Sequence, residues 1–228
     1  MADQTKIQHL GIIMDGNRRW ARSRGLSPSE GHRAGCEKAK EVLKWCREAE
    51  IKILTLYAFS TENWRRAKSE VNFLMNIFYR ILTKDIKELH KNNVRVRIVG
   101  RKEDFSEKLQ KAIEESEKLT ENNTGIILNL AINYGGRQEI VDAFNKIMEN
   151  PPKKITENII SQNIYTAGLP DPNLIIRTSG EMRLSGFLMW QSVYSELRFV
   201  KRHWPDFSKK DFNDALADFA NRQRRFGK

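Results

Sequence analysis

The chain has 228 residues, of which 39% are hydrophobic and 30% charged, a composition typical of a globular domain with a sizeable core. Lys and Arg number 40 against 29 Asp and Glu, and this net charge of +11 favours an anionic partner such as nucleic acid, a membrane surface or a phosphorylated substrate. No apolar run approaches the ~20 residues of a membrane-spanning helix, and the first residues lack a signal-peptide pattern, so we expect a cytoplasmic protein.

Apolar runs alternate with stretches of helical periodicity along the whole chain. The longest helical pattern covers residues 69–90, and the helix at 139–148 stops before two prolines. The predicted elements are, in chain order, strand 10–14, helix 31–50, strand 51–59, helix 69–90, strand 92–100, helix 105–119, strand 126–132, helix 139–148, strands 173–178 and 195–200, and helix 208–225.

This alternation predicts a single α/β domain over residues 1–228, built on a mainly parallel sheet with helices on both faces. In such sheets ligands bind beyond the carboxyl ends of the strands. Four polar clusters follow predicted strands, and we expect them to converge on one crevice: Asp15, residues 60–63, "NYGGR" at 133–137 and "RTSGE" at 177–181.

The first cluster, "MDGNRRWA", joins a carboxylate to a glycine and several cations. Gly16 lets the backbone approach a ligand, and Arg18 and Arg19 can neutralise a phosphate. Asp15 would repel a phosphate unless a hard cation bridged the two, and Mg²⁺ takes one or two carboxylates together with substrate phosphates. The pattern therefore indicates a diphosphate and a metal ion, although an Asp-Gly turn before a solvated basic helix fits the same residues. The glycine patterns of P-loops and dinucleotide folds are absent.

Two further clusters carry candidate binding groups. In "FSTENWRR", Asn63 can donate and accept a hydrogen bond, while Trp64 beside its arginines fits a pocket wall or a surface cation–π pair. In residues 177–197, Arg177 and Arg183 suit a second diphosphate, and Glu196 is a second metal candidate. Each of these charges taken alone also fits a surface ion pair.

Five segments, taken in order, resemble the motifs of the cis-prenyltransferases, in particular the bacterial undecaprenyl diphosphate synthases. They are "HLGIIMDGNRRWA", "LTLYAFSTENW", "NYGGR", "RTSGEMRLSGFLMWQSVYSEL" and "WPDF…RRFG", and they span residues 9–227. The resemblance implies a homodimer with a six-stranded, mainly parallel sheet flanked by helices, and an elongated hydrophobic tunnel. It also implies Mg²⁺-dependent condensation of isopentenyl diphosphate onto an allylic diphosphate, usually farnesyl diphosphate. The product would be a long polyprenyl diphosphate such as undecaprenyl diphosphate, the precursor of the cell-wall glycan lipid carrier.

The resemblance also assigns roles to residues. Asp15 and Asn63 would be catalytic, with Asp15 and Glu196 as metal ligands and Arg225 reaching the partner subunit's site. The implied substrate-binding residues are Gly16, Asn17, Arg18, Arg19, Trp20, His32, Ser60, Thr61, Glu62, Trp64, Arg66, Arg177, Arg183, Leu184, Ser185 and Arg225.

The chain departs from the family pattern in two places. Pro28 stands where an arginine usually precedes His32 by four residues, so that phosphate contact is either missing or supplied by Arg22 or Arg24. Gly186 replaces a common asparagine, which concerns local backbone packing more than chemistry. Ala58 would leave room in the narrow part of the tunnel, which favours a medium or long product.

Two other classes of protein compete with this interpretation. A nucleic-acid-binding protein would interleave aromatic and basic residues on one face and need no carboxylate in its pocket, so no nucleic acid is expected. An inactive subunit of a heteromeric prenyltransferase would be expected to lack Asp15 or Asn63, both of which are present. Because the implied product is a lipid, a peripheral contact with the inner face of the membrane stays open.

Overall fold

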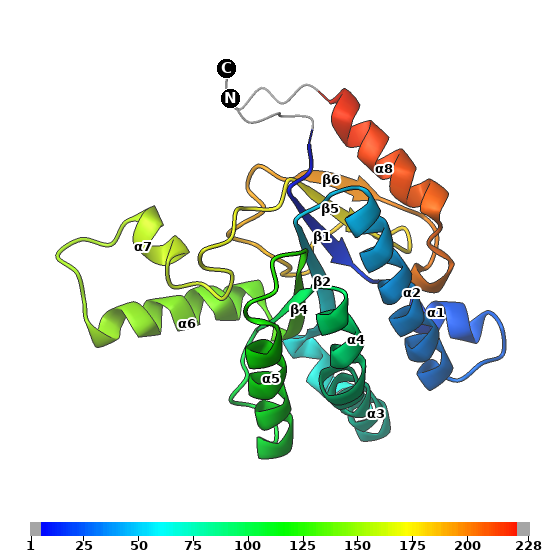
Figure 1. Cartoon of the computed structure of the whole chain (residues 1–228), viewed down its shortest axis with the longest axis horizontal. Helices are drawn as coiled ribbons and strands as arrows, with labels where there is room; N and C mark the ends of the chain where they lie inside the picture. The colour runs from blue at the N-terminus through cyan, green and yellow to red at the C-terminus, as the bar shows by residue number, and fades with distance from the viewer. Residues whose placement is uncertain (1–5, 223–228) are drawn as a thin grey trace.

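A computed structural model describes residues 6–222 and contains one sheet of six parallel strands, in the order β3-β4-β2-β1-β5-β6 (Figure 1). Every predicted strand is confirmed, as is the six-stranded parallel sheet. The strands are β1 His9–Ile13, β2 Ile53–Ser60, β3 Arg95–Val99, β4 Ile127–Tyr134, β5 Leu174–Arg177 and β6 Glu196–Phe199.

Helices connect these strands and flank the sheet. None of those in the described part of the chain is long and apolar enough to cross a membrane. The α-helices are α1 Asn17–Arg22, α2 Pro28–Glu48, α3 Lys68–Arg80, α4 Ile86–Lys91, α5 Glu107–Thr120, α6 Gly136–Glu149, α7 Glu157–Ser161 and α8 Lys209–Asn221. The short helical turns are the 3₁₀ helices η1 Thr61–Arg65 and η3 Trp204–Asp206, and the π-helix η2 Ile81–Asp85.

Helix α2 begins three residues before its predicted start. Ser27 accepts a hydrogen bond from the backbone N–H of Glu30, whose carboxylate accepts from the N–H of Ser27, and Pro28 occupies the first helical position. This reciprocal capping satisfies donors that the first turn of a helix leaves free. Pro28, the residue that replaces the family's arginine, therefore begins a helix.

The helix predicted at residues 69–90 is interrupted. After α3 the chain widens into η2, where the Thr83 hydroxyl donates to the Tyr79 carbonyl at 2.7 Å. Asp85 ends this turn and lies 3.0 Å from the ammonium of Lys40 on α2. A periodic apolar stripe does not reveal a single-turn π segment, because the extra residue changes the hydrogen-bonding step and leaves the average spacing almost unaltered.

The sheet packs differently on its two faces. On one face, side chains such as Leu54 and Leu128 join helices α2 to α5 and α8 in one large apolar cluster. On the other, Ile13 and Tyr134 pack against Phe187 and Leu188, which lie in a non-helical segment after β5. The prediction of helices on both faces is thus incomplete, since part of the second face is covered by this segment.

A buried polar chain crosses the sheet away from the carboxyl ends of its strands. The His9 ring lies 2.7 Å from the Pro170 carbonyl through Nδ1 and 2.7 Å from the Thr55 hydroxyl through Nε2. Thr55 also accepts from the Asn129 amide at 2.9 Å. Since a carbonyl only accepts, the Nδ1 of His9 carries the proton. Both ring nitrogens of the neutral imidazole therefore have a hydrogen-bond partner.

Candidate functional site

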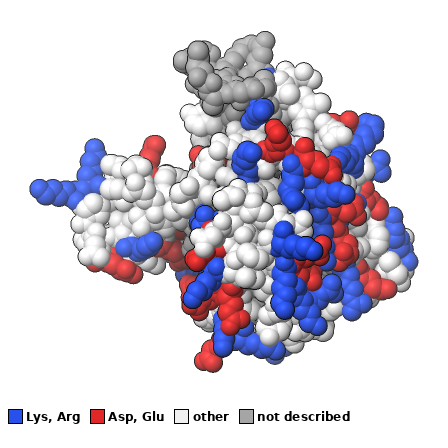
Figure 2. All heavy atoms as spheres, viewed as in Figure 1, with Lys and Arg blue, Asp and Glu red and all other residues white. Residues whose placement is uncertain are grey.

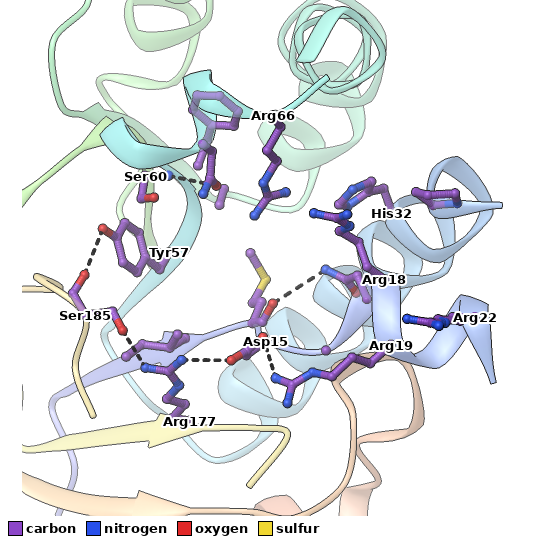
Figure 3. A pocket seen from close by; sticks show the side chains of 18 of the residues that line it. Asp15, Arg18, Arg19, Arg22, His32, Tyr57, Ser60, Arg66, Arg177 and Ser185 are labelled. Atoms are coloured by element: carbon purple, nitrogen blue, oxygen red, sulfur yellow. Dashed lines mark hydrogen bonds and ion pairs between the residues drawn. The ribbon is translucent and has the colours of Figure 1, made fainter. Parts of the chain in front are cut away.

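A cavity of about 780 Å³ opens at the carboxyl ends of β1, β2 and β5 (Figure 3). Its walls carry five arginines and a single carboxylate, that of Asp15, so an anion is favoured inside it. The lining residues are Ile13, Met14, Asp15, Gly16, Asn17, Arg18, Arg19, Arg22, Gly25, Leu26, Pro28, His32, Tyr57, Ala58, Phe59, Ser60, Asn63, Arg66, Arg177 and Ser185.

Asp15 lies between two guanidinium groups in this cavity. Arg177 donates through Nη2 to Oδ2 at 2.8 Å, and Nη2 of Arg19 lies 3.0 Å from Oδ1. Burial opposes ionisation of the carboxyl, but hydrogen bonds from Arg177 and then Arg19 outweigh it and lower the pKa of Asp15. The group is therefore a carboxylate at neutral pH, with each oxygen paired to a guanidinium.

The backbone on either side of Asp15 is clamped. Its N–H donates to the Thr178 hydroxyl at 3.0 Å, and its carbonyl accepts from that hydroxyl at 2.7 Å. Gly16 follows with φ of 104°, and a Cβ there would lie 2.7 Å from the Ser179 hydroxyl. Only glycine fits this left-handed, crowded position, which turns the chain from β1 directly into α1.

Helix α1 presents its cations to the cavity selectively. Arg18, Arg19 and Arg22 line the cavity, whereas Arg24 pairs with Asp206 at 3.0 Å outside it. Of the two arginines considered as replacements for the one missing at Pro28, the structure therefore places Arg22 at the cavity. Trp20 does not line the cavity, and its indole N–H donates to Asp206 at 2.7 Å.

Glu70 organises the opposite wall, and the sequence patterns did not single it out. Its Oε1 lies 3.0 Å from His32 Nε2 and accepts from Arg66 Nη1 at 3.0 Å, while Oε2 lies 3.8 Å from Arg18. Burial opposes the charged form, yet the hydrogen bond from His32 and the charge of Arg66 help lower the pKa of Glu70. The signal available was an acid in the first turn of the predicted helix, a position typical of a carboxylate that interacts with the helix N-terminus.

The residues after β2 form η1 and are only partly directed into the cavity. Asn63 lines the cavity with Ser60, whose backbone N–H donates to Asn63 Oδ1 at 3.2 Å. Three neighbours lie outside the lining: Thr61, against Gly135; Glu62, which is exposed; and Trp64, whose indole donates to Asn133 at 2.7 Å. Of the predicted cluster at 60–64, only Ser60 and Asn63 therefore lie at the cavity with Asp15.

Arg177 is 5% exposed and anchors the third cluster. It donates to Asp15, to the Ser185 hydroxyl at 2.8 Å and to the Arg183 carbonyl. The Arg183 side chain instead points to Glu181 at 2.6 Å, and Glu181 in turn lies 2.9 Å from Arg19. Arg183 does not line the cavity, nor does Leu184, which packs against the apolar cluster around Phe187.

Glu196 lies apart from Asp15 within the chain. It is in register with Leu174, and Leu174 with Leu10, so it stands at the opposite end of these strands from Asp15. Its carboxylate pairs with Arg222, and it does not line the cavity. Among residues 6–222 no group of three or more His, Cys, Asp or Glu side chains gathers as a metal site. Arg225 falls outside the described residues.

A second cavity, of about 350 Å³, lies between α2 and α4 over β2 and β4. Leu56 of β2 lines this cavity and Ala58 lines the first, and both pack with the large apolar cluster on one face of the sheet, so the two cavities follow one another along that face. They share no lining residue, which differs from the single elongated tunnel implied by the resemblance. The apolar lining is Ala39, Leu43, Leu56, Ile81, Leu89, Val94, Leu128 and Leu130.

The surface charge is not gathered into one basic face on the side drawn in Figure 2, where Lys and Arg side chains are interspersed with Asp and Glu. Several Lys and Arg side chains form ion pairs close in sequence, such as Lys38 with Glu41 and Lys40 with Glu37. This distribution contrasts with the cavity, where arginines outnumber the carboxylate. The excess of arginines suits the cavity to a small anionic ligand.

Comparison with known sequences places these features in a family. Residues 13–227 match the family described as "Putative undecaprenyl diphosphate synthase". The chain is 49% identical to an isoprenyl transferase of Thermus thermophilus, an alignment covering 97% of this chain and 89% of that protein. It is 46% identical to a Legionella pneumophila protein over 96% of this chain and 95% of the relative. That protein is named ditrans,polycis-undecaprenyl-diphosphate synthase ((2E,6E)-farnesyl-diphosphate specific).

A solved structure shares the whole fold. It is lavandulyl diphosphate synthase from Lavandula x intermedia in complex with dimethylallyl diphosphate, with a TM-score of 0.94 and 38% sequence identity. The comparison covers 99% of this chain and 100% of the other.

Proposed function

The chain belongs to the undecaprenyl diphosphate synthase family of isoprenyl transferases, and from this premise we propose that it condenses isopentenyl diphosphate units onto an allylic diphosphate with the help of Mg²⁺. The proposed primer is farnesyl diphosphate and the proposed product a long polyprenyl diphosphate such as undecaprenyl diphosphate, for use as a cell-wall lipid carrier. The observation that carries the proposal is the placement of Asp15 between Arg19 and Arg177 in a cavity lined by five arginines.

The residues around Asp15 suit both substrates. Breaking the allylic C–O bond leaves negative charge on the departing diphosphate, which the fixed guanidinium groups of Arg18, Arg19 and Arg22 stabilise as it develops. Arg177 and Ser185, joined at 2.8 Å, offer fork and hydroxyl donors for the diphosphate of the second substrate.

The donor set also fits Mg²⁺. Asp15 supplies one carboxylate, and this ion completes its shell with phosphate oxygens and water. Asn17 follows Gly16 in the same cavity wall, but its Oδ1 is buried against Gly35 of α2 and is not offered to the metal. When bound, the ion would withdraw charge from the leaving diphosphate. Glu196 does not join Asp15 within one chain, so its proposed metal role would require a second subunit.

Asn63 is the proposed group for the proton that isopentenyl diphosphate loses. Its side chain lines the cavity beside Ser60. Because an amide can both donate and accept a hydrogen bond, Asn63 can orient the substrate, or a diphosphate oxygen, so that the proton has an acceptor. The neighbouring Tyr57 does not supply a phenolate base, because burial raises the pKa of its hydroxyl.

The second cavity is the proposed receptacle for hydrocarbon. It continues from the first along β2 and is lined by Leu43, Leu89 and Leu128 among others. Each CH₂ buried there contributes roughly 0.8 kcal/mol, so a growing chain is drawn away from water. Movement of side chains between the two cavities would have to accompany elongation.

We also propose that the protein is a homodimer and that it touches the membrane only peripherally, where its lipid product is delivered. Val141, Phe144 and Met148 lie on one face of α6 and are at least 40% exposed, an apolar stripe at helical spacing. Met189 and Val193 are also exposed large apolar residues. Such a surface is typical of a subunit interface.

A product assay tests the proposed function. The purified chain is incubated with labelled isopentenyl diphosphate and Mg²⁺, with farnesyl or dimethylallyl diphosphate as the primer, and products are resolved by length. A ladder that a chelator abolishes, ending in one dominant long product from farnesyl diphosphate, supports the proposal. A single condensation, seen only with dimethylallyl diphosphate as the primer, would contradict both the proposed primer and the long product. No incorporation with any primer, in folded protein, contradicts the proposal.

A further inference from the structure

The segment "WPDF", residues 204–207, lies between β6 and α8 and supplies no residue to either cavity. Trp204 and Phe207 are fully buried and stack at 5.7 Å, so they anchor the segment in the core. Asp206 is its polar member, and its side chain is 39% exposed. Water alone would solvate an acid this exposed, so the contacts of Asp206 with other side chains point to a structural role.

Trp204 connects the Asp15 turn to helix α2. Its backbone N–H donates to the Asp15 carbonyl at 3.0 Å, and its indole N–H donates to the Gly35 carbonyl at 2.8 Å. Gly35 in turn lies against Asn17, since a Cβ at Gly35 would meet Asn17 Oδ1 at 2.3 Å. Asn17, the first residue of α1, thus packs against Gly35 of α2, the residue whose carbonyl accepts from Trp204.

Asp206 holds the far side of α1. Its Oδ1 accepts from the Trp20 indole at 2.7 Å, and Nη2 of Arg24 lies 3.0 Å from its Oδ2. The Arg24 guanidinium also lies 4.5 Å from the centre of the Trp20 ring. Neither Trp20 of α1 nor Arg24, in the turn directly after α1, lines the cavity, whereas Arg18 and Arg19 of α1 do. Asp206 therefore holds α1 from the side away from the ligand.

We propose that Asp206 is a positioning residue, which fixes α1 through Trp20 and Arg24 so that Arg18 and Arg19 meet the allylic diphosphate. This role rests on the proposed function of the cavity. Helix α1 has only six residues, too few to hold a helical conformation by itself, so its placement depends on such tertiary contacts. The geometry predicts that loss of Asp206 weakens allylic diphosphate binding specifically, because Arg177 and Ser185 are held by other residues.

The test compares Asp206→Ala with Asp206→Asn, which keeps an oxygen acceptor for Trp20, and with Asp214→Ala as a matched control. Asp214 is an exposed acid that pairs with Lys210 on α8, remote from α1 in its contacts. In Asp206→Ala we expect the KM for the allylic diphosphate to rise about tenfold, with kcat and the KM for isopentenyl diphosphate within twofold of wild type. The Asn variant should retain most of the affinity, and the control should be unchanged.

Hydrogen exchange of residues 17–22 gives a readout that does not depend on activity. Exchange in these amides should be faster in Asp206→Ala than in wild type and unchanged in Asp214→Ala. Equal exchange, or an equal KM for the allylic diphosphate, overturns the proposal. A wild-type chain that lacks activity contradicts the proposed function instead, and the exchange comparison still decides whether Asp206 positions α1.

A double-mutant cycle with Trp20→Phe separates positioning from direct binding. This variant keeps an aromatic ring and removes the indole donor. If Asp206 acts through Trp20, the double variant should raise the KM no more than about twofold beyond Asp206→Ala. Full additivity of the two effects would show that Trp20 acts on the substrate independently of Asp206 and would overturn the proposed route.

Discussion

Acidification should destabilise the protein through His9, which lies far from the cavity in the buried polar chain with Thr55 and Asn129. Burial lowers the pKa of His9 to about 4, and the hydrogen bond with Pro170 opposes this only in part. In the unfolded chain the pKa is about 6.5. Between these values the unfolded state binds the proton and the folded state does not, so stability falls as the pH is lowered.

The size of the effect follows from this difference. A pKa gap of about 2.5 units corresponds to about 3 kcal/mol at the low-pH limit, since each unit is worth about 1.4 kcal/mol. At pH 5 the loss attributable to His9 is about 2 kcal/mol, and at pH 7 it is close to zero. Against a total stability on the order of 5–15 kcal/mol, this loss is large enough to measure.

Urea unfolding at pH 7, 6 and 5 tests the reasoning, with His9→Gln as the comparison because its amide does not titrate. Many carboxylates also titrate over this range, but they are common to both proteins and cancel in the difference. The wild type should lose about 2 kcal/mol more than the variant between pH 7 and 5. Parallel pH dependences of the two proteins would refute the assignment of a depressed pKa to His9.

Four other changes have defined outcomes. Asp15→Asn should lower kcat at least hundredfold with unchanged circular dichroism, and near-normal turnover would exclude the proposed metal role. Gly35→Ala should lower kcat/KM about tenfold, because the new Cβ would lie 2.3 Å from Asn17 Oδ1 and displace α1. Alanine favours a helix by roughly 1 kcal/mol over glycine, so a raised melting temperature with unchanged kcat/KM would contradict this expectation. Leu89→Trp should fill the second cavity and shorten the product, as chromatography would show, whereas a full-length product would place the hydrocarbon elsewhere. Phe144→Asp should convert dimer to monomer in sedimentation, and an unchanged dimer would place the interface on another surface.

The amino-acid sequence by itself determined the six strands and much of the first cavity. Each strand is a short apolar run bounded by turn or polar residues. This pattern is local in sequence, and burial of the strand in the core agrees with it. Parallel strands end at one edge, so the four polar clusters directly after them were expected to meet. Asp15, Ser60, Asn63 and Arg177 do line the cavity, but no residue of 133–137 lines it.

Only the tertiary structure decided which of the nearby charges face the cavity. Arg22 and Arg24 are two residues apart on the chain, yet Arg22 lines the cavity while Asp206 draws Arg24 away. Similarly, Glu70 is held at the cavity wall by contact with His32, which lies 38 residues earlier in the sequence. A local pattern carries no information about such partners, because the contact forms only once the sheet has brought distant segments together.

The same reason explains the positions of Glu196 and of helix α1. Glu196 matched a motif, but strand register places it at the other end of the sheet from Asp15. Helix α1 is too short to be stable alone, and its position is set by Gly35, Trp204 and Asp206, all distant in sequence. Hydrophobic periodicity thus determined where the elements are, and long-range packing determined which side chains each of them presents to the ligand.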